Sequence, residues 1–323
     1  MTDVPDDVMN IPDDLYAHGP DTDAAGHVPV LAEAVLQVLA PAPGQVFLDC
    51  TVGRGGHAAL IVPHLAPGGT YIGLDADPTN AAFSRSRLAN APVTVHVRHA
   101  NFAAAQSVLD ELGIDRVDGL LADLGFASSQ MSDPSRGFSF LVEGPLDMRL
   151  DPRLTRTAAD LVNTLPEKQL ADLIYLYGEE RLSRRIARKI VEVRQRHPIH
   201  TTTELAELVR QAYGPRGRRM RIDPATRTFM ALRIAVNDEL AVLEQLLAGL
   251  KDLLRPGGRA AIISFHSLED RLVKRAFLKL QQDGLAQRLT RKPIVADEAE
   301  QRANPRSRSA KLRAIQWLAP DGN

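Results

Sequence analysis

The sequence VFLDCTVGRGGHA occupies residues 46–58 and joins a short apolar run to a glycine-rich turn. Gly53, Gly55 and Ala58 fit the pattern G-x-G-x-x-(G/A), which turns a β-strand sharply into a helix. Glycine tolerates positive φ and, having no Cβ, lets backbone N–H groups approach a ligand. A second apolar run ends at Asp75, about twenty residues beyond the turn, where a carboxylate can accept both hydroxyls of an adenosine ribose. The turn and the acid together predict a nucleoside-cofactor site.

The turn belongs to a longer alternation of strand and helix patterns. Strands are expected at residues 46–48, 71–74, 93–97 and 117–121. Such alternation indicates a parallel sheet with helices on both faces, and ligands bind beyond the carboxyl ends of the strands in these sheets. Gly53–His57, Asp75, Phe102 and Asp123 all lie at those ends. We therefore expect four segments that are distant in the chain to meet at one crevice.

A different pattern interrupts this alternation between about residues 133 and 223, where helical periods and loops dominate. A helix is expected over Glu179–Arg196, and residues 181–221 contain twelve Lys or Arg against three Glu. Dense charge of one sign beside the expected crevice favours contact with nucleic-acid phosphates over a merely solvated face. We interpret residues 134–223 as an inserted helical domain that recognises RNA.

The strand and helix alternation returns after the insertion. The elements expected there are a long helix over Thr226–Leu254, a sharp turn at residues 255–258, a strand over Arg259–Phe265, a helix over Leu268–Leu280, and two last strands at Leu289–Val295 and Lys311–Leu318. The predicted fold is therefore α/β, a Rossmann-like sheet that is parallel apart from an antiparallel last strand. Residues 27–133 and 224–323 are expected to form it together.

Composition limits the kind of protein. The 323 residues are 44% hydrophobic and 24% charged, as in soluble globular proteins, and no apolar run is long enough to cross a membrane. Residues 1–26 contain seven Asp and no Lys or Arg, which predicts a disordered acidic tail rather than a secretory signal, so a cytoplasmic location is expected. The single cysteine, Cys50, excludes an internal disulfide. No His, Cys and Asp residues stand at metal-ligand spacing, so we expect no metal in the protein.

Two cofactor classes share this sheet, glycine turn and ribose acid: nicotinamide dinucleotides and S-adenosylmethionine. The sequence after the fourth strand, Asp123-Leu124-Gly125-Phe126, resembles the (D/N)-P-P-(Y/F) loop of enzymes that methylate exocyclic amino groups of bases. Such an amine is a poor nucleophile because its lone pair is delocalised into the ring. An acceptor for its N–H groups favours a localised lone pair, and an aromatic side chain can stack on the extruded base. Asp123 is therefore the catalytic candidate.

These residues alone leave other interpretations open. His266, at the end of the fifth strand, is a candidate to accept the proton that the amine sheds, or a histidine that is only hydrogen-bonded. Residues 136–140 and 147–149 are equally compatible with an access path for a flipped nucleotide and with a structural loop. An NAD-dependent dehydrogenase could use the same glycine turn, and a non-catalytic ribosome-assembly factor could bind RNA through the basic stretch.

Longer segments carry a more specific resemblance. They are His27–Leu31, Asp49–His57, Asp75–Pro78, Asp123–Gly125, Ser128–Gln130, Arg136–Phe140, Gly144–Arg149, Tyr177–Arg181, Arg227–Phe229, Leu232–Ile234, Val236–Asn237, Glu239–Leu240, Ser264–Arg271 and Asn304–Ser309. In these segments the chain resembles the bacterial 16S ribosomal RNA cytosine N4-methyltransferases. The resemblance covers the chain in order, leaving out only the acidic tail.

This resemblance implies S-adenosylmethionine as methyl donor and a cytidine N4 amine in the decoding region of 16S ribosomal RNA as acceptor. The small ribosomal subunit is the implied partner, and the oligomeric state is left open between a monomer and a homodimer. By position, Gly55, Gly56 and His57 are implied to lie near the methionine part of the cofactor. The other implied roles are Asp75 at the ribose, Phe102 by the adenine, Asp123 near the transfer site and Gln130 closing the pocket.

Overall fold

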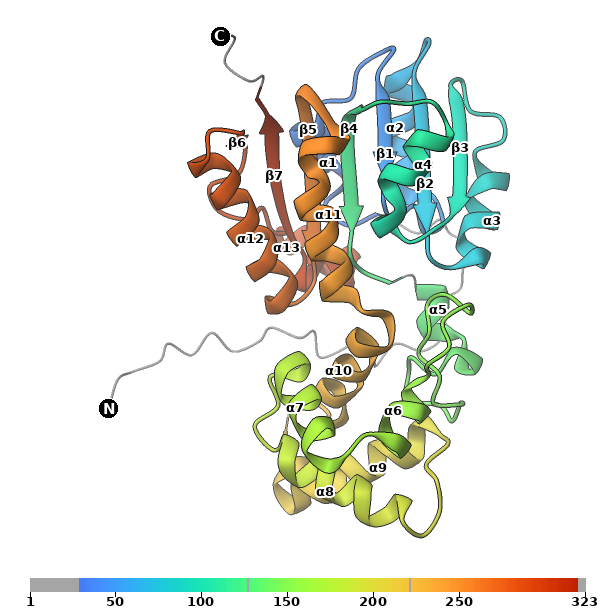
Figure 1. The fold of residues 1–323 in the computed structure, drawn as a ribbon, viewed down its shortest axis with the longest axis vertical. Helices are drawn as coiled ribbons and strands as arrows, with labels where there is room; N and C mark the ends of the chain where they lie inside the picture. Colours follow the sequence, from blue (N-terminus) through green and yellow to red (C-terminus); the bar gives the residue numbers. More distant parts are fainter. Residues whose placement is uncertain (1–28, 127, 221, 319–323) are drawn as a thin grey trace.

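The computed structural model describes residues 29–126, 128–220 and 222–318, so the expected acidic tail at residues 1–26 lies outside the described residues. A seven-stranded sheet forms the larger part, with the strand order β3-β2-β1-β4-β5-β7-β6 (Figure 1). Its strands are β1 (Val46–Asp49), β2 (Thr70–Asp75), β3 (Thr94–His99), β4 (Val117–Asp123), β5 (Leu254–Ser264), β6 (Ala286–Arg288) and β7 (Lys311–Trp317).

The first five strands pair in parallel, whereas β7 is antiparallel to β5 and β6 is antiparallel to β7. The predicted Rossmann-like fold is thus confirmed, with two antiparallel strands at one edge. The chain order reverses at β1, which has β2 on one side and β4 on the other. Such a reversal opens a crevice at the carboxyl ends of the strands, where ligands bind in this class of sheet.

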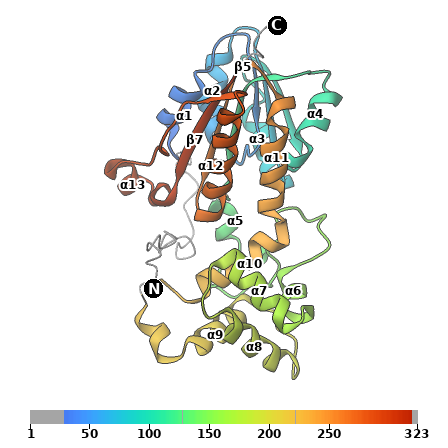
Figure 2. The same ribbon diagram turned by 60° about the vertical axis from the view of Figure 1, so that its left-hand side comes forward.

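Helices cover both faces of the sheet (Figures 1 and 2). One face packs against α1 (Ala32–Leu39), α2 (Gly56–Leu65) and α3 (Pro78–Arg87). The other packs against α4 (Ala105–Glu111), which follows the 3₁₀ turn η1 (Phe102–Ala104), and against α11 (Glu239–Leu253) and α12 (Ser267–Gln282). The short elements α13 (Glu298–Ala303) and η4 (Pro305–Ser309) precede β7. None of the described helices combines the length and the apolar character that a membrane span requires.

The remaining helices form a separate unit below the carboxyl ends of β1 to β4 in Figure 1. They are α5 (Ser128–Ser132), η2 (Pro134–Arg136), α6 (Ala158–Thr164), α7 (Glu167–Gly178), α8 (Ser183–Arg194), α9 (Thr202–Tyr213), η3 (Gly214–Arg219) and α10 (Ala225–Asn237). One apolar core holds this unit together, and α10 contributes Phe229, Leu232 and Val236 to it. In packing terms the helical unit therefore extends to Asn237.

The expected long helix over Thr226–Leu254 is wrong, because the chain breaks it at Asp238. This residue has the left-handed φ of 50°, which Asp and Asn tolerate better than most residues. The side-chain amide of Asn237 donates to the carbonyl of Met148 at 2.8 Å, and its oxygen accepts from the N–H of Leu150 at 2.7 Å. These contacts fix the end of α10 against the helical unit, so α11 starts in a new direction. The expected helix over Glu179–Arg196 likewise begins only at Ser183, because Glu179 has a φ of 47°.

The expected strand over Leu289–Val295 is also wrong. Its place beside β7 is taken by the shorter β6, and only an isolated bridge between Ile294 and Leu312 falls within the expected range. The hydroxyl of Thr290 accepts the N–H of Ala314 at 3.0 Å where a strand would offer a carbonyl. The turn expected at residues 255–258 is a bulge within β5, since Leu254 faces Val117 and Arg259 faces Gly119.

Two glycines offer a matched test of packing. A Cβ on Gly119, in the middle of β4, would lie inside the van der Waals surface of the Phe47 ring, whereas on Gly249 of α11 it would meet only Leu253 Cδ1 at 3.9 Å. We predict that Gly119→Ala lowers the free energy of unfolding by about 1–3 kcal/mol through overpacking. Gly249→Ala should raise it by about 0.5–1 kcal/mol through helix propensity. Urea denaturation monitored by circular dichroism measures both, and an unchanged midpoint for Gly119→Ala would contradict the described contact.

Candidate active site

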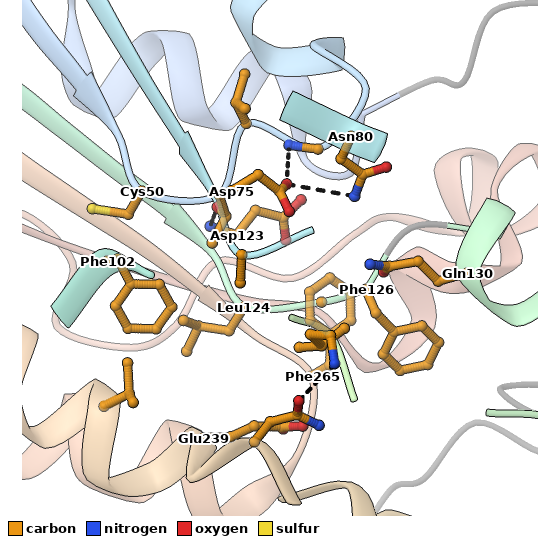
Figure 3. A pocket seen from close by; sticks show the side chains of 18 of the residues that line it. Cys50, Asp75, Asn80, Phe102, Asp123, Leu124, Phe126, Gln130, Glu239 and Phe265 are labelled. Carbon is orange, nitrogen blue, oxygen red and sulfur yellow. Dashed lines mark hydrogen bonds between the residues drawn. The ribbon is translucent and has the colours of Figure 1, made fainter. Parts of the chain in front are cut away.

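A pocket of about 280 Å³ lies between the carboxyl edge of the sheet and the helical unit (Figure 3). Its wall comes from the glycine turn after β1, from the ends of β2, β4 and β5, and from α10 and the start of α11. The sequence-predicted residues that line it are Gly56, His57, Asp75, Phe102, Asp123 and Gln130. Gly55 is part of the turn and not of the wall. The structure thus brings segments from four loops to one mouth.

The glycine turn owes its shape to two left-handed residues, Gly53 with a φ of 53° and Gly55 with a φ of 76°. A Cβ on Gly55 would meet Ser84 Oγ at 3.3 Å, so the turn also packs closely on α3. Gly55 stands at the N-cap of α2 and has no side chain to cap it. Backbone N–H groups at the start of α2 therefore remain available to a polar ligand.

Asp75 sits at the end of β2 as a half-buried acceptor. Its carboxylate accepts the backbone N–H of Gly53 at 2.8 Å and that of Asp77 at 2.8 Å, and Asn80 Nδ2 lies 3.5 Å from it. Burial raises the pKa of Asp75 to about 7, since it outweighs these hydrogen bonds. Figure 3 shows the carboxylate held between the glycine turn and Asn80. Its remaining lone pairs suit a pair of ribose hydroxyls.

Asp123 and His57 face each other across the pocket floor, with 3.5 Å between Asp123 Oδ2 and His57 Nε2. Asp123 Oδ1 and both ring nitrogens of His57 are buried without a hydrogen-bond partner among the described residues. Asp49 lies behind them and accepts the hydroxyl of Tyr71 at 2.5 Å, and burial raises the pKa of its carboxyl. Buried polar atoms are rarely left unsatisfied, so this floor is shaped for a polar ligand.

At the mouth of the pocket, Gln130 shares a hydrogen-bond acceptor with Arg136. Its Nε2 donates to Asp77 Oδ2 at 2.9 Å, and Arg136 Nη1 donates to the same oxygen at 2.6 Å. Burial acts to raise the pKa of Asp77, but the hydrogen bonds from Gln130 and Arg136 outweigh it and lower the pKa. Arg136 Nη2 also donates to the carbonyls of Arg149 and Leu150, at 3.0 Å each. One guanidinium thereby ties the helical unit to the N-terminus of α3.

The two segments left open by sequence, residues 136–140 and 147–149, are mainly structural. Phe138, Phe140 and Met148 are buried in the core of the helical unit. Arg149 forms a two-fold ion pair with Asp147, at 2.7 Å for both contacts. The structure therefore favours the structural-loop interpretation over an access path for a flipped nucleotide.

Sequence reasoning missed a network on the opposite wall. Arg233 of α10 lies over the Phe126 ring, with 4.7 Å from its Cζ to the ring centroid, and makes two 2.9 Å contacts with the carboxylate of Glu239. Phe138 stacks parallel to Phe126 at 6.2 Å between centroids. The Phe126 ring is thus half-buried between these neighbours and still lines the pocket. Residues this far apart in the chain give no spacing signal.

His266 belongs to the same wall as the N-cap of α12. Its Nδ1 accepts the N–H of Glu269 at 3.4 Å, whereas its Nε2 lies 3.2 Å from Glu269 Oε1 without a hydrogen bond among the described residues. The helix-capping contact supports the hydrogen-bonded interpretation of His266, and its role as a proton acceptor stays a prediction. Glu239, His266 and Glu269 bring ligand atoms within 4.8 Å of one another. Arg233 already contacts both oxygens of Glu239, so a guanidinium neutralises this group of acids.

Comparisons with known proteins identify relatives of this chain. Residues 24–318 match the MraW methylase family. Ribosomal RNA small subunit methyltransferase H of Geobacter sp. (strain M21) is 48% identical over 90% of this chain and 98% of its own length. The same enzyme of Deinococcus radiodurans is 52% identical over 92% of each chain. A solved structure of a putative rRNA-methylase from Clostridium thermocellum has 13% identity and a TM-score of 0.39, covering 90% of this chain and 99% of its own.

The raised pKa of Asp75 predicts a pH dependence of cofactor binding. We expect the ribose hydroxyls to donate to the ionised carboxylate of Asp75, so that binding favours the charged form. The affinity should therefore be full well above pH 7 and fall as the pH drops through about 7. We predict that the dissociation constant for S-adenosylmethionine rises about tenfold between pH 8 and pH 6, measured by calorimetry. Asp75→Asn should bind weakly with little change over this range, and a wild-type affinity that is flat from pH 6 to 8 would contradict the assignment.

Proposed function

The chain belongs to the MraW methylase family, and we propose that it methylates the exocyclic N4 amine of a cytidine in the decoding region of 16S ribosomal RNA. Relatives at 48% and 52% identity, matched over nearly their whole length, are small-subunit ribosomal RNA methyltransferases. The chain is accordingly an S-adenosylmethionine-dependent enzyme that acts on small-subunit ribosomal RNA. Membership of this family sets aside the NAD-dependent dehydrogenase and the non-catalytic assembly factor.

The residues around the pocket fit S-adenosylmethionine, which supplies an electrophilic methyl group on a sulfonium. We assign Asp75 to the ribose hydroxyls, because its carboxylate is half-buried and oriented by two backbone N–H groups. Phe102 and Leu243 belong to the apolar part of the wall and suit the flat adenine ring. The floor that His57 and Asp123 form, with Asp49 buried behind it, suits the amino and carboxylate groups of the methionine part, since it sets an acid beside unsatisfied ring nitrogens.

The unsatisfied carboxylate of Asp123 carries the mechanistic proposal. It stands at the end of β4 on the pocket wall, with Oδ1 buried and unpartnered among the residues described. We assign it to accept a hydrogen bond from the cytidine N4–H group, which favours a localised lone pair on nitrogen. When bound, S-adenosylmethionine would supply the methyl group to this nitrogen from its sulfonium, and Asp123 would accept the proton that the methylated amine sheds. Alignment of the reacting atoms supplies most of the rate enhancement in such a transfer.

The helical unit is assigned to RNA recognition. Residues 134–223 and α10 lie across the pocket from the sheet, and Met230, Arg233 and Asn237 of α10 line it directly. The target base would therefore enter between the two units, against the Phe126 ring and its Arg233 partner. Such a position excludes water from the transfer site once the base is in place.

We predict that Asp123→Asn lowers the turnover number at least about 100-fold, because the amide keeps the shape but cannot take the amine proton. The assay follows labelled methyl transfer to small subunits from cells that lack this enzyme, with mass mapping of the modified cytidine. Asp118→Asn is a matched control on the same strand, since Asp118 pairs with the exposed Arg255 outside the pocket. Normal turnover by Asp123→Asn would remove this residue from the mechanism, and labelling of no cytidine by the wild type would reject the proposed function.

A further inference from the structure

A face of α8 carries four arginines that the pocket does not use. Arg184, Arg185 and Arg188 lie on the exposed side of the helix, and Arg181 is exposed just before it. Their spacing of three and four residues places them along one side of a helix. The opposite side of α8 buries Ile186, Ala187 and Ile190 in the helical core. We call Arg181, Arg184, Arg185 and Arg188 the α8 arginine face.

These guanidiniums differ from others in the protein by their lack of close acidic partners. Arg136, Arg149 and Arg233 each make an ion pair of 2.9 Å or less. Within the described parts of the chain, no carboxylate lies within ion-pairing distance of Arg181, Arg184 or Arg185. Arg188 has a contact of 3.7 Å with Glu167, between two exposed side chains, and such contacts contribute little. The face is thus positively charged and open to an anionic partner.

The α8 arginine face is remote from the pocket. Helix α10 lines the pocket, α7 packs on α10, and α8 packs on α7. Both views show α8 at the end of the helical unit away from the sheet (Figures 1 and 2). Two helix spacings of about 8–10 Å and a helix radius of about 5 Å put the face roughly 20–25 Å beyond the axis of α10. Each strand of a double helix carries one phosphate per about 3.4 Å of helix axis, so this span corresponds to roughly six or seven base pairs along the helix.

We propose that the α8 arginine face binds backbone phosphates of the substrate RNA at a second contact, separate from the nucleotide in the pocket. The proposal rests on the function proposed above and adds the extent of the RNA that the enzyme holds. Phosphate is the partner that an unpaired row of guanidiniums fits best, because each one can donate two parallel hydrogen bonds to it. A contact with backbone phosphates fixes the position of the RNA on the protein and does not distinguish its base sequence. The enzyme therefore selects a target that continues as folded RNA well beyond the modified cytidine.

Binding of two labelled RNAs tests this without relying on turnover. One is a long fragment of 16S ribosomal RNA around the target, and the other is a short oligonucleotide with the target cytidine and two neighbours on each side. For Arg184→Glu/Arg185→Glu we expect about tenfold weaker binding of the long RNA and a salt dependence reduced by about two in log–log slope. Binding of the short RNA and of S-adenosylmethionine should stay within twofold of wild type.

Two further variants distinguish a local phosphate contact from damage to the helical unit and from an effect of the protein's net charge. Glu192→Lys lies on the exposed side of the same helix, four residues after Arg188, and should tighten binding of the long RNA about threefold. Arg291→Glu/Lys292→Glu reverses two exposed charges outside the helical unit and should leave binding of both RNAs unchanged. Unchanged binding of the long RNA by Arg184→Glu/Arg185→Glu, equal loss on the short RNA, or an equal effect of Arg291→Glu/Lys292→Glu would overturn the proposal. A wild type that binds the long RNA but methylates none would reject the proposed function and leave the second contact standing.

Discussion

The carboxylate of Asp77 forms the joint between the sheet and the helical unit, the two halves of the molecule. It caps α3 through the N–H of Thr79 and receives hydrogen bonds from Gln130 and Arg136. Arg136 in turn donates to the carbonyls of Arg149 and Leu150, and the N–H of Leu150 donates to Asn237 at the end of α10. A buried charge held by several donors is costly to expose, so removal of one partner penalises the whole joint. The pocket exists because this joint holds the helical unit against the sheet.

The acids in and behind the pocket floor suit a cationic ligand. Burial raises the pKa of Asp49 and Asp75, and Asp123 lies close enough to Asp49 to raise it further. A bound sulfonium and ammonium would stabilise the ionised forms of all these acids. These acids are therefore poorly solvated in the free protein, and the positive charges of the bound cofactor would compensate them. This difference in the solvation of the acids explains how a small site can hold a positively charged cofactor, with a histidine as the basic side chain of the floor.

The sequence predicts the parts of the site that depend on local pattern. Parallel strands place their carboxyl ends at one edge, so the glycine turn, Asp75, Phe102 and Asp123 could be assigned to one crevice before any coordinates. The contacts of Arg136 with Asp77 and of Arg233 with Phe126 could not, because each joins residues more than fifty positions apart. The break at Asp238 and the short β6 were missed for a related reason. Both follow from side-chain hydrogen bonds, by Asn237 and Thr290, that compete with regular backbone pairing.

The path of the chain between β4 and α11 has a consequence for how such enzymes diversify. The helical unit leaves the sheet after Asp123 and returns at Asp238, so it occupies a single loop of an otherwise ordinary β4–α11–β5 crossover. A gene that lost or exchanged this loop would still encode all seven strands in their order. Recognition of the nucleic acid can therefore change by replacement of this loop, while the glycine turn, Asp75 and Asp123 are inherited with the sheet.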